Sequence, residues 1–248
     1  MAAPRSVRAR AHTVVERLAE LYPGTARELC ALRHEGPFQL LVATILSAQC
    51  TDARVNLVTP AVFETYPTPA ALARADPERL EEMVRTTGFF RSKARNLIAM
   101  AGAVEERFDG QVPSEMDDLV SLPGVGRKTA NVVRSIAFDL PGLPVDTHVG
   151  RLARRLALSA SDDPVVVERD LDALVPPAER GTFSERLILH GREVCVARSP
   201  RCGACVLSDI CPSCRLPAAP ARRRARARER GTKAGGGGGH ARERRERA

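Results

Sequence analysis

The sequence has few aromatic residues and no long apolar run. Its 248 residues include no Trp, and aromatic residues make up 4% of the chain. Strand-like alternation of apolar and polar residues is hard to find, and no run of 18 apolar residues exists, which argues against a transmembrane helix. The N-terminal segment MAAPRSVRARAH is basic but lacks the apolar stretch of a secretory signal. We therefore expect a cytoplasmic protein that has no membrane partner.

Apolar residues recur at helical spacing along most of the chain. The segment FQLLVATILSAQ, at 38–49, is long and apolar enough for a buried helix. In VGRLARRLALS, at 149–159, Val149, Leu152 and Leu156 share one face. Prolines fall between such stretches. The pattern predicts an all-α fold of about ten helices with short connections.

Lysine is almost absent: the 38 basic residues comprise 35 Arg and 3 Lys. One of the three, Lys128, follows Arg127 in LPGVGRKTAN, at 122–131. Lys can lose its proton near neutral pH, whereas Arg cannot, and an imine with a sugar aldehyde carbon requires an amine. Lys128 is therefore a candidate nucleophile, and the alternative is a solvated Lys on a helix face.

The LPGVG segment predicts a tight turn between two helices. Gly124 and Gly126 can both take a positive φ there. A helix that starts after such a turn presents unpaired N–H groups and a positive dipole end, which together suit a phosphate. The alternative is a helix connection that binds nothing.

Asp146 stands 18 residues after Lys128, in PVDTHVGRL. It precedes a predicted helix, so an N-cap role is expected. If it faces the hairpin, it can also accept a proton or stabilise positive charge on a sugar ring, and the two roles are compatible. Nearby His148 either bonds a phosphate or packs.

Five of the seven cysteines fall between residues 195 and 214. This clustering indicates metal ligation rather than disulfides. Zinc would be held in a CxxC-x5-CxxC pattern by Cys202, Cys205, Cys211 and Cys214. A [4Fe–4S] cluster would instead take Cys195, Cys202, Cys205 and Cys211. Spacing alone does not separate these two ligand sets.

Most of the basic charge lies in the C-terminal tail. Residues 215–248 hold 12 Arg or Lys and 3 Glu, a net charge of +9, so residues 1–214 carry −1. The tail has almost no large apolar residue and contains five consecutive glycines, which predicts disorder. It is either a nucleic-acid-binding arm or a solubilising tail.

Taken together, the motifs resemble the endonuclease III family of helix–hairpin–helix DNA glycosylases. The resemblance covers roughly residues 11–214 and is carried by LSAQCTD, TGFFRSKARNL, LPGVGRKTAN, VDTHVGR and the spacing C-x6-C-x2-C-x5-C. It implies two helical lobes with a DNA cleft between them. One lobe would combine 11–29 with 141–214 and carry the cluster loop at 195–211. The other would span 30–140, with the helix–hairpin–helix at about 115–135, and the ends at 1–10 and 215–248 would be flexible.

The resemblance also implies an activity and its residues. Family members release oxidised pyrimidines from duplex DNA and cut 3′ to the abasic site by β-elimination, which leaves a 5′-phosphate. Lys128 would be the nucleophile and Asp146 the catalytic carboxylate. The [4Fe–4S] ligands would be Cys195, Cys202, Cys205 and Cys211, with Cys214 outside the family pattern. The partner would be double-stranded DNA with a damaged base or abasic site, bound by a nucleoid-associated monomer.

Further DNA contacts follow from the same resemblance. Gln49 would fill the hole left by the extruded nucleotide, and Phe89 would be an apolar wedge where the family usually has Leu. The hairpin would grip the backbone. The predicted DNA-binding residues are Gln49, Phe89, Leu122, Gly124, Val125, Gly126, Arg127 and His148.

Two alternatives remain at this point. A monofunctional adenine glycosylase of the same superfamily would lack the Lys and carry an extra C-terminal domain. A non-enzymatic DNA-binding protein would combine the helix–hairpin–helix with a zinc knuckle.

Overall fold

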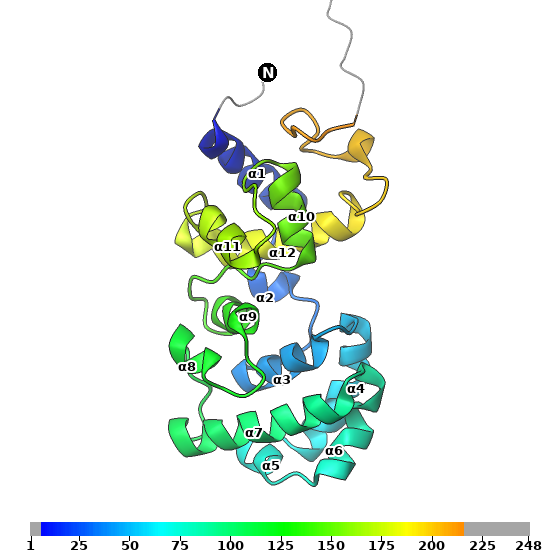
Figure 1. The fold of residues 1–248 in the computed structure, drawn as a ribbon, viewed down its shortest axis with the longest axis vertical. Helices are drawn as coiled ribbons and strands as arrows, with labels where there is room; N and C mark the ends of the chain where they lie inside the picture. Colours follow the sequence, from blue (N-terminus) through cyan, green and yellow to red (C-terminus); the bar gives the residue numbers. More distant parts are fainter. Residues whose placement is uncertain (1–5, 216–248) are drawn as a thin grey trace, which may run out of the picture. The chain divides into compact units, whose positions relative to one another are not determined.

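Helices account for all the regular structure that the computed structural model describes, which covers residues 6–215 (Figure 1). Within this range the α-helices are α1 (Val7–Leu21), α2 (Ala26–Leu29), α3 (Pro37–Ser47), α4 (Asp52–Thr65), α5 (Pro69–Ala73), α6 (Pro77–Val84), α7 (Phe90–Phe108), α8 (Met116–Val120), α9 (Arg127–Ala137), α10 (Thr147–Arg155), α11 (Pro164–Asp172) and α12 (Arg180–Glu193). Short 3-10 turns are η1 (Arg85–Thr87), η2 (Pro177–Glu179) and η3 (Cys202–Ala204). The all-α prediction is confirmed. No helix in this range is long and apolar enough to cross a membrane.

The first helix begins earlier than the sequence suggested. The Ser6 hydroxyl accepts a hydrogen bond from the Ala9 N–H and caps α1, so helical structure starts at Val7. The segment expected to be flexible was 1–10, and its last four residues are helical instead. The rest of that expectation, and the predicted disorder of the tail beyond residue 215, lie outside the described residues.

Buried apolar side chains form two separate cores. One gathers residues from α3 to α9 together with Ala26 of α2. The other gathers residues from α1, α10, α11 and α12, with Leu207 and Ile210 from the cysteine-rich loop. Helix α9 packs against α3 of the first group and against α12 of the second. The helix that carries Lys128 therefore stands where the two groups meet. The lobe division at residues 30 and 140 stays a prediction.

The hairpin between α8 and α9 depends on one close approach. Gly124 has φ +76°, and a Cβ there would lie 2.9 Å from the Cβ of Asn96 on α7, so only glycine fits. Gly126 differs from the expectation of positive φ. It caps α9 with φ −94°, an extended conformation, and nothing lies within 4 Å of where its Cβ would be.

Candidate active site and cysteine-rich loop

The start of α9 offers several free backbone donors beside Lys128. Its N-cap is Gly126, so no side chain caps the helix, and the first turn holds no acidic residue. The N–H groups of Arg127, Lys128 and Thr129 have no acceptor among residues 6–215. Gly126, Arg127 and Lys128 are exposed. Free donors at an exposed helix start, with the positive end of the helix dipole, are the arrangement that binds a phosphate.

Asp146 caps α10, as the sequence predicts. Its Oδ1 accepts hydrogen bonds from the N–H groups of His148 at 2.7 Å and Val149 at 2.8 Å. Because a single oxygen takes both bonds, the second carboxylate oxygen stays available. The structure brings Asp146 and Lys128 together, since both line the same two cavities.

The first of these cavities is an open groove, here called the outer groove. It has a volume of about 640 Å³, within the roughly 300–1,000 Å³ range of ligand clefts. Gln49 and Arg154 line it together with Lys128 and Asp146. Gln49 is thus placed beside the candidate catalytic pair.

The second cavity, here called the inner pocket, runs behind the same pair. Its other polar residues include Asp52 of α4 and Glu185 and Arg192 of α12. Arg192 donates a hydrogen bond to Asp52 at 2.8 Å. Sequence reasoning singled out none of the three: Glu185 and Arg192 belong to none of the motifs, and Asp52 ends LSAQCTD without having been given a role. The one available signal was Glu185 standing two residues before the apolar run LIL, at 187–189.

Gln49 and Phe89 lie in turns with an unusual backbone. Both have positive φ, +54° for Gln49 and +47° for Phe89, a conformation that non-glycine residues rarely adopt. Both side chains are exposed, and Phe89 is 67% exposed although it is a large apolar residue. Such strain collects at functional sites. This geometry is consistent with insertion into a duplex, and that role stays a prediction.

A buried lysine ties these two turns together. Lys93 on α7 is 5% exposed, and its Nζ donates hydrogen bonds to the carbonyl oxygens of Leu46 and Thr87, each at 2.8 Å. Leu46 lies three residues before Gln49, and Thr87 lies two before Phe89. Burial lowers the pKa of Lys93. The scarcity of lysine pointed to Lys93 as well as Lys128, but sequence reasoning took up only Lys128.

Three predicted DNA-binding side chains are engaged within the protein. Leu122 and Val125 are buried in the first core. The Arg127 guanidinium forms a two-pronged ion pair with buried Glu168 on α11, with N–O distances of 2.7 to 3.1 Å. The hairpin can therefore contact DNA through its backbone rather than through these side chains.

His148 packs against α12. A Cβ at Gly191 would lie 3.0 Å from the Cβ of His148, so the two helices approach closely there. The ring Nδ1 also lies 3.1 Å from the Arg151 guanidinium. Of the two roles expected for His148, packing is the one with a visible contact.

The clustered cysteines line a single cavity. Cys195, Cys202, Cys205, Cys211 and Cys214 surround it, together with Arg155. Among residues 6–215, no three His, Cys, Asp or Glu side chains come close enough to hold one metal ion. A single zinc needs its thiolates about 2.3 Å from one point. Thiols spread around a cavity suit a cluster of several atoms.

Hydrogen-bond donors surround two of these sulfurs. The Arg155 guanidinium donates to Cys195 Sγ at 3.2 Å. The Leu207 N–H donates to Cys205 Sγ at 3.4 Å, and His190 Nε2 lies 3.3 Å from the same sulfur. Such donors stabilise the negative charge of thiolates in iron–sulfur sites. The residues present therefore fit a four-thiolate cluster.

Comparison with known proteins places the chain in a family. Residues 42–177 match the HhH-GPD superfamily of base excision DNA repair proteins, and residues 195–211 match the iron–sulfur binding domain of endonuclease III. Endonuclease III of a Synechocystis species is 52% identical over 209 residues, covering 84% of this chain and 94% of the relative. The chain belongs to the endonuclease III family. Endonuclease III of Bacillus subtilis is 42% identical, covering 79% of this chain and 89% of the relative.

Solved structures agree with this family assignment. A trapped endonuclease III–DNA covalent intermediate matches with a TM-score of 0.78 and 40% identity, covering 83% of this chain and 96% of that chain. A thermostable thymine-DNA glycosylase has a TM-score of 0.72 at 21% identity, which shows the shared fold alone. The predicted helix–hairpin–helix glycosylase fold is confirmed.

Membership in the endonuclease III family identifies the cofactor, while the assignment of its four cysteine ligands stays a prediction. The iron–sulfur domain match ends at Cys211, so it includes Cys195 and leaves out Cys214. The cofactor is a single [4Fe–4S] cluster, as predicted, and the zinc-knuckle and adenine-glycosylase alternatives find no support among these relatives. Cys214 nevertheless lines the same cavity.

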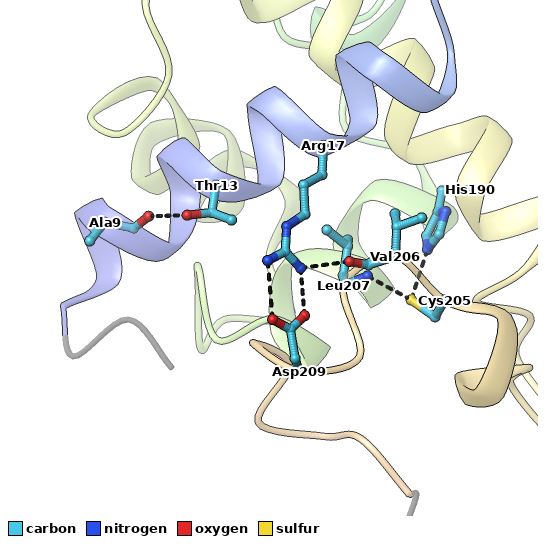
Figure 2. Close-up of polar contacts among 8 residues, drawn as sticks. All are labelled: Ala9, Thr13, Arg17, His190, Cys205, Val206, Leu207 and Asp209. Carbon is cyan, nitrogen blue, oxygen red and sulfur yellow. Dashed lines mark hydrogen bonds and ion pairs between the residues drawn. The ribbon is translucent and has the colours of Figure 1, made fainter. Parts of the chain in front are cut away.

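The N-terminal helix holds the cysteine-rich loop in place. Figure 2 shows Arg17 of α1 reaching to the Val206 carbonyl, at 2.7 Å, and to the carboxylate of Asp209. In the same view, His190 and the backbone of Leu207 approach the sulfur of Cys205. The loop is therefore fixed from two sides, by α1 and by α12.

Proposed function

We propose that the chain is a DNA glycosylase and abasic-site lyase that removes oxidised pyrimidines from duplex DNA. The observation that supports this most directly is the meeting of Lys128 and Asp146 at two shared cavities. It occurs in a member of the family to which the trapped endonuclease III–DNA covalent intermediate belongs. The place of action would be the cytoplasm, at the nucleoid.

DNA binding begins at the phosphate backbone. The free N–H groups at the start of α9 hold phosphates next to the damaged nucleotide. Exposed Arg198 and Arg201 of the cysteine-rich loop add further phosphate contacts. Extruding the nucleotide costs a few kcal/mol, less for a poorly stacked lesion. Gln49 and Phe89 offset part of that cost by refilling the stack.

The chemistry needs the amine and the carboxylate together. The Asp146 oxygen that is free of backbone bonds accepts a proton from Lys128, whose Nζ then attacks the sugar C1′. The bond from C1′ to the base breaks and the base leaves with the electron pair. The C1′–O4′ bond then opens, O4′ takes a proton from the attached nitrogen, and a protonated imine forms at C1′. Loss of a C2′ proton then expels the 3′ phosphate. The products are a 5′-phosphate and an unsaturated aldehyde.

The cysteine-rich loop supports binding rather than these steps. Cys195, Cys202, Cys205 and Cys211 would hold the cluster. When bound, the cluster supplies covalent cross-links within the loop. Arg155 and Arg17 hold the two ends of the loop against α10 and α1. This fixes Arg198 and Arg201 in one orientation.

A borohydride trap tests the proposal. The protein is mixed with duplex DNA carrying one abasic site and reduced, with Lys128→Ala run in parallel. We expect a covalent complex with the wild type only, because the imine forms at Lys128. A complex with both proteins would assign the imine to another amine. Base release without any complex would mean that the enzyme lacks the lyase step.

A further inference from the structure

Glu185 is a buried carboxyl group that the proposed mechanism leaves unused. It lies in the middle of α12, is 9% exposed, and lines the inner pocket with Lys128 and Asp146. Its oxygens form no hydrogen bond or ion pair with another residue between 6 and 215, and they keep access to the pocket. Burying a carboxyl group without a partner is costly.

The position of Lys128 and Asp146 indicates which part of the substrate faces the inner pocket. Lys128 and Asp146 line both the outer groove and the inner pocket. The inner pocket has a volume of about 80 Å³, smaller than the roughly 300 Å³ of a ligand cleft. A sugar whose C1′ lies against the pair, with its backbone in the outer groove, would therefore turn only the O2 edge of its base toward the pocket and Glu185. Of the two cations that line the pocket, Arg192 is paired with Asp52 and Lys128 is the candidate nucleophile. Among the carboxyl groups of this lining, Asp52 is paired with Arg192 and Asp146 accepts two backbone N–H groups, which leaves Glu185 as the one without a hydrogen-bond partner among residues 6–215.

The charges around Glu185 set its protonation. Burial is the main cause that raises its pKa to about 7. Arg192 on its own helix and Lys128 on α9 lower the pKa, while Asp146 before α10 and Asp52 on α4 raise it. The thiol of Cys30, after α2, also faces it, and burial raises that pKa to about 12, so Cys30 stays neutral. Near neutral pH, Glu185 is therefore present in both its acid and its carboxylate form.

We propose that Glu185 is the acid that protonates the departing pyrimidine, which deepens the proposed function and rests on it. As the bond between C1′ and N1 breaks, its electron pair spreads over N1 and O2 of the base. The Glu185 O–H passes its proton to O2, and the base leaves neutral. The Lys128 ammonium gives one proton to Asp146 and a second to O4′ as the C1′–O4′ bond opens to the protonated imine, and solvent returns a proton to Glu185. A protonated carboxyl also offers one donor and one acceptor, which matches the O2 and N3–H edge of a pyrimidine.

The test separates base release from strand cutting. Single-turnover release of thymine glycol from a duplex is compared with nicking of a duplex that carries a preformed abasic site. Glu185→Gln keeps the shape of the side chain but cannot supply the proton. We expect base release to slow by about 10²-fold, while abasic nicking, which has no base to protonate, keeps its rate. Glu185→Asp should recover part of base release. Glu179→Gln, at the start of the same helix, serves as the matched control.

The pH dependence provides a second test that needs no variant. In the wild type, base release relative to abasic nicking should fall as the pH rises through about 7, because the acid form of Glu185 is lost. Glu185→Gln should show no such fall. Unchanged base release in Glu185→Gln, or a flat wild-type ratio between about pH 6 and about pH 8, would overturn the assignment. If Glu185→Gln fails to fold, the wild-type ratio decides alone. Wild-type protein that neither nicks nor traps would instead defeat the proposed function.

Discussion

The two lysines of the described residues, Lys93 and Lys128, have different roles: one is a buried structural residue and the other is the candidate nucleophile. Lys128 stands at open cavities beside Asp146. Lys93 is buried, and its two bonded carbonyls belong to the turns that present Gln49 and Phe89. A compact ammonium group can serve two carbonyls in a narrow space, where the planar fork of Arg is too wide.

Replacing Lys93 should lower both the stability of the protein and its affinity for DNA. Lys93→Met leaves the carbonyls of Leu46 and Thr87 buried without a donor, at a cost of about 1–3 kcal/mol in the free energy of unfolding. It also releases the two turns. We expect lower thermal stability and a raised KM for abasic duplex, with kcat less affected. If Lys93→Met is as stable as the wild type, Lys93 does not hold the two turns together.

Glu185 should make stability depend on pH. Its pKa in the folded state, about 7, exceeds its ordinary value of 4.5. Because the folded chain binds this proton more tightly, stability is highest below about pH 4.5 and is lost as the pH rises through about 7. The loss amounts to about 3 kcal/mol. Glu185→Gln removes the penalty, so it should unfold at a higher temperature than the wild type at pH 8 and show little gain at pH 5. If the unfolding temperatures of Glu185→Gln and the wild type differ by the same amount at pH 5 and pH 8, Glu185 is not a buried titrating group.

At the scale of elements, one ion pair connects α9 with α11. Glu168 is largely buried, with its side chain 8% exposed, whereas the Arg127 side chain is 51% exposed. Arg127 therefore serves chiefly to neutralise a carboxylate on another helix. Its backbone N–H remains free at the start of α9.

This pairing predicts what Arg127→Ala does. Glu168 would lose its partner, so the free energy of unfolding should fall by about 1–3 kcal/mol, because the exposed guanidinium is partly screened by water. The salt dependence of DNA binding should stay the same. A side chain bound to phosphate would instead reduce the slope of log K against log salt by about 1. Measuring both quantities on one variant separates the two roles.

Apolar periodicity and motifs in the sequence predicted the helices that are long or that carry a motif. The segments 38–49 and 149–159 correspond to α3 and α10, and Asp146 is the predicted cap. Short helices such as α2 and α5, of four and five residues, were not foreseen because they hold barely one turn of periodicity. The Lys128–Asp146 pair was foreseen from chemistry. Glu185 and Lys93 were not, because their surroundings come from distant parts of the chain.

At the scale of the whole molecule, charge is divided unevenly between the described part and the tail. Residues 215–248 carry +9 and residues 1–214 carry −1. Removing residues 217–248 should make log K for DNA less steep against log salt, if the tail contacts phosphates. The rate of nicking at saturating DNA should be unchanged, since the candidate site lies before residue 216. An unchanged salt slope would leave the tail without a role in binding DNA.

The bond from Arg17 to Val206 spans nearly the whole described chain. On a ribosome, α1 is made first, yet its partners α10, α11 and α12 and the cysteine-rich loop come last. At roughly 5–20 residues per second, α1 waits about 10–40 seconds for them. Meanwhile the core that begins at α3 can close on its own. Cluster insertion is therefore a late event in biogenesis. Helix α1 is the first helix to be synthesised and the last to pack against its partners.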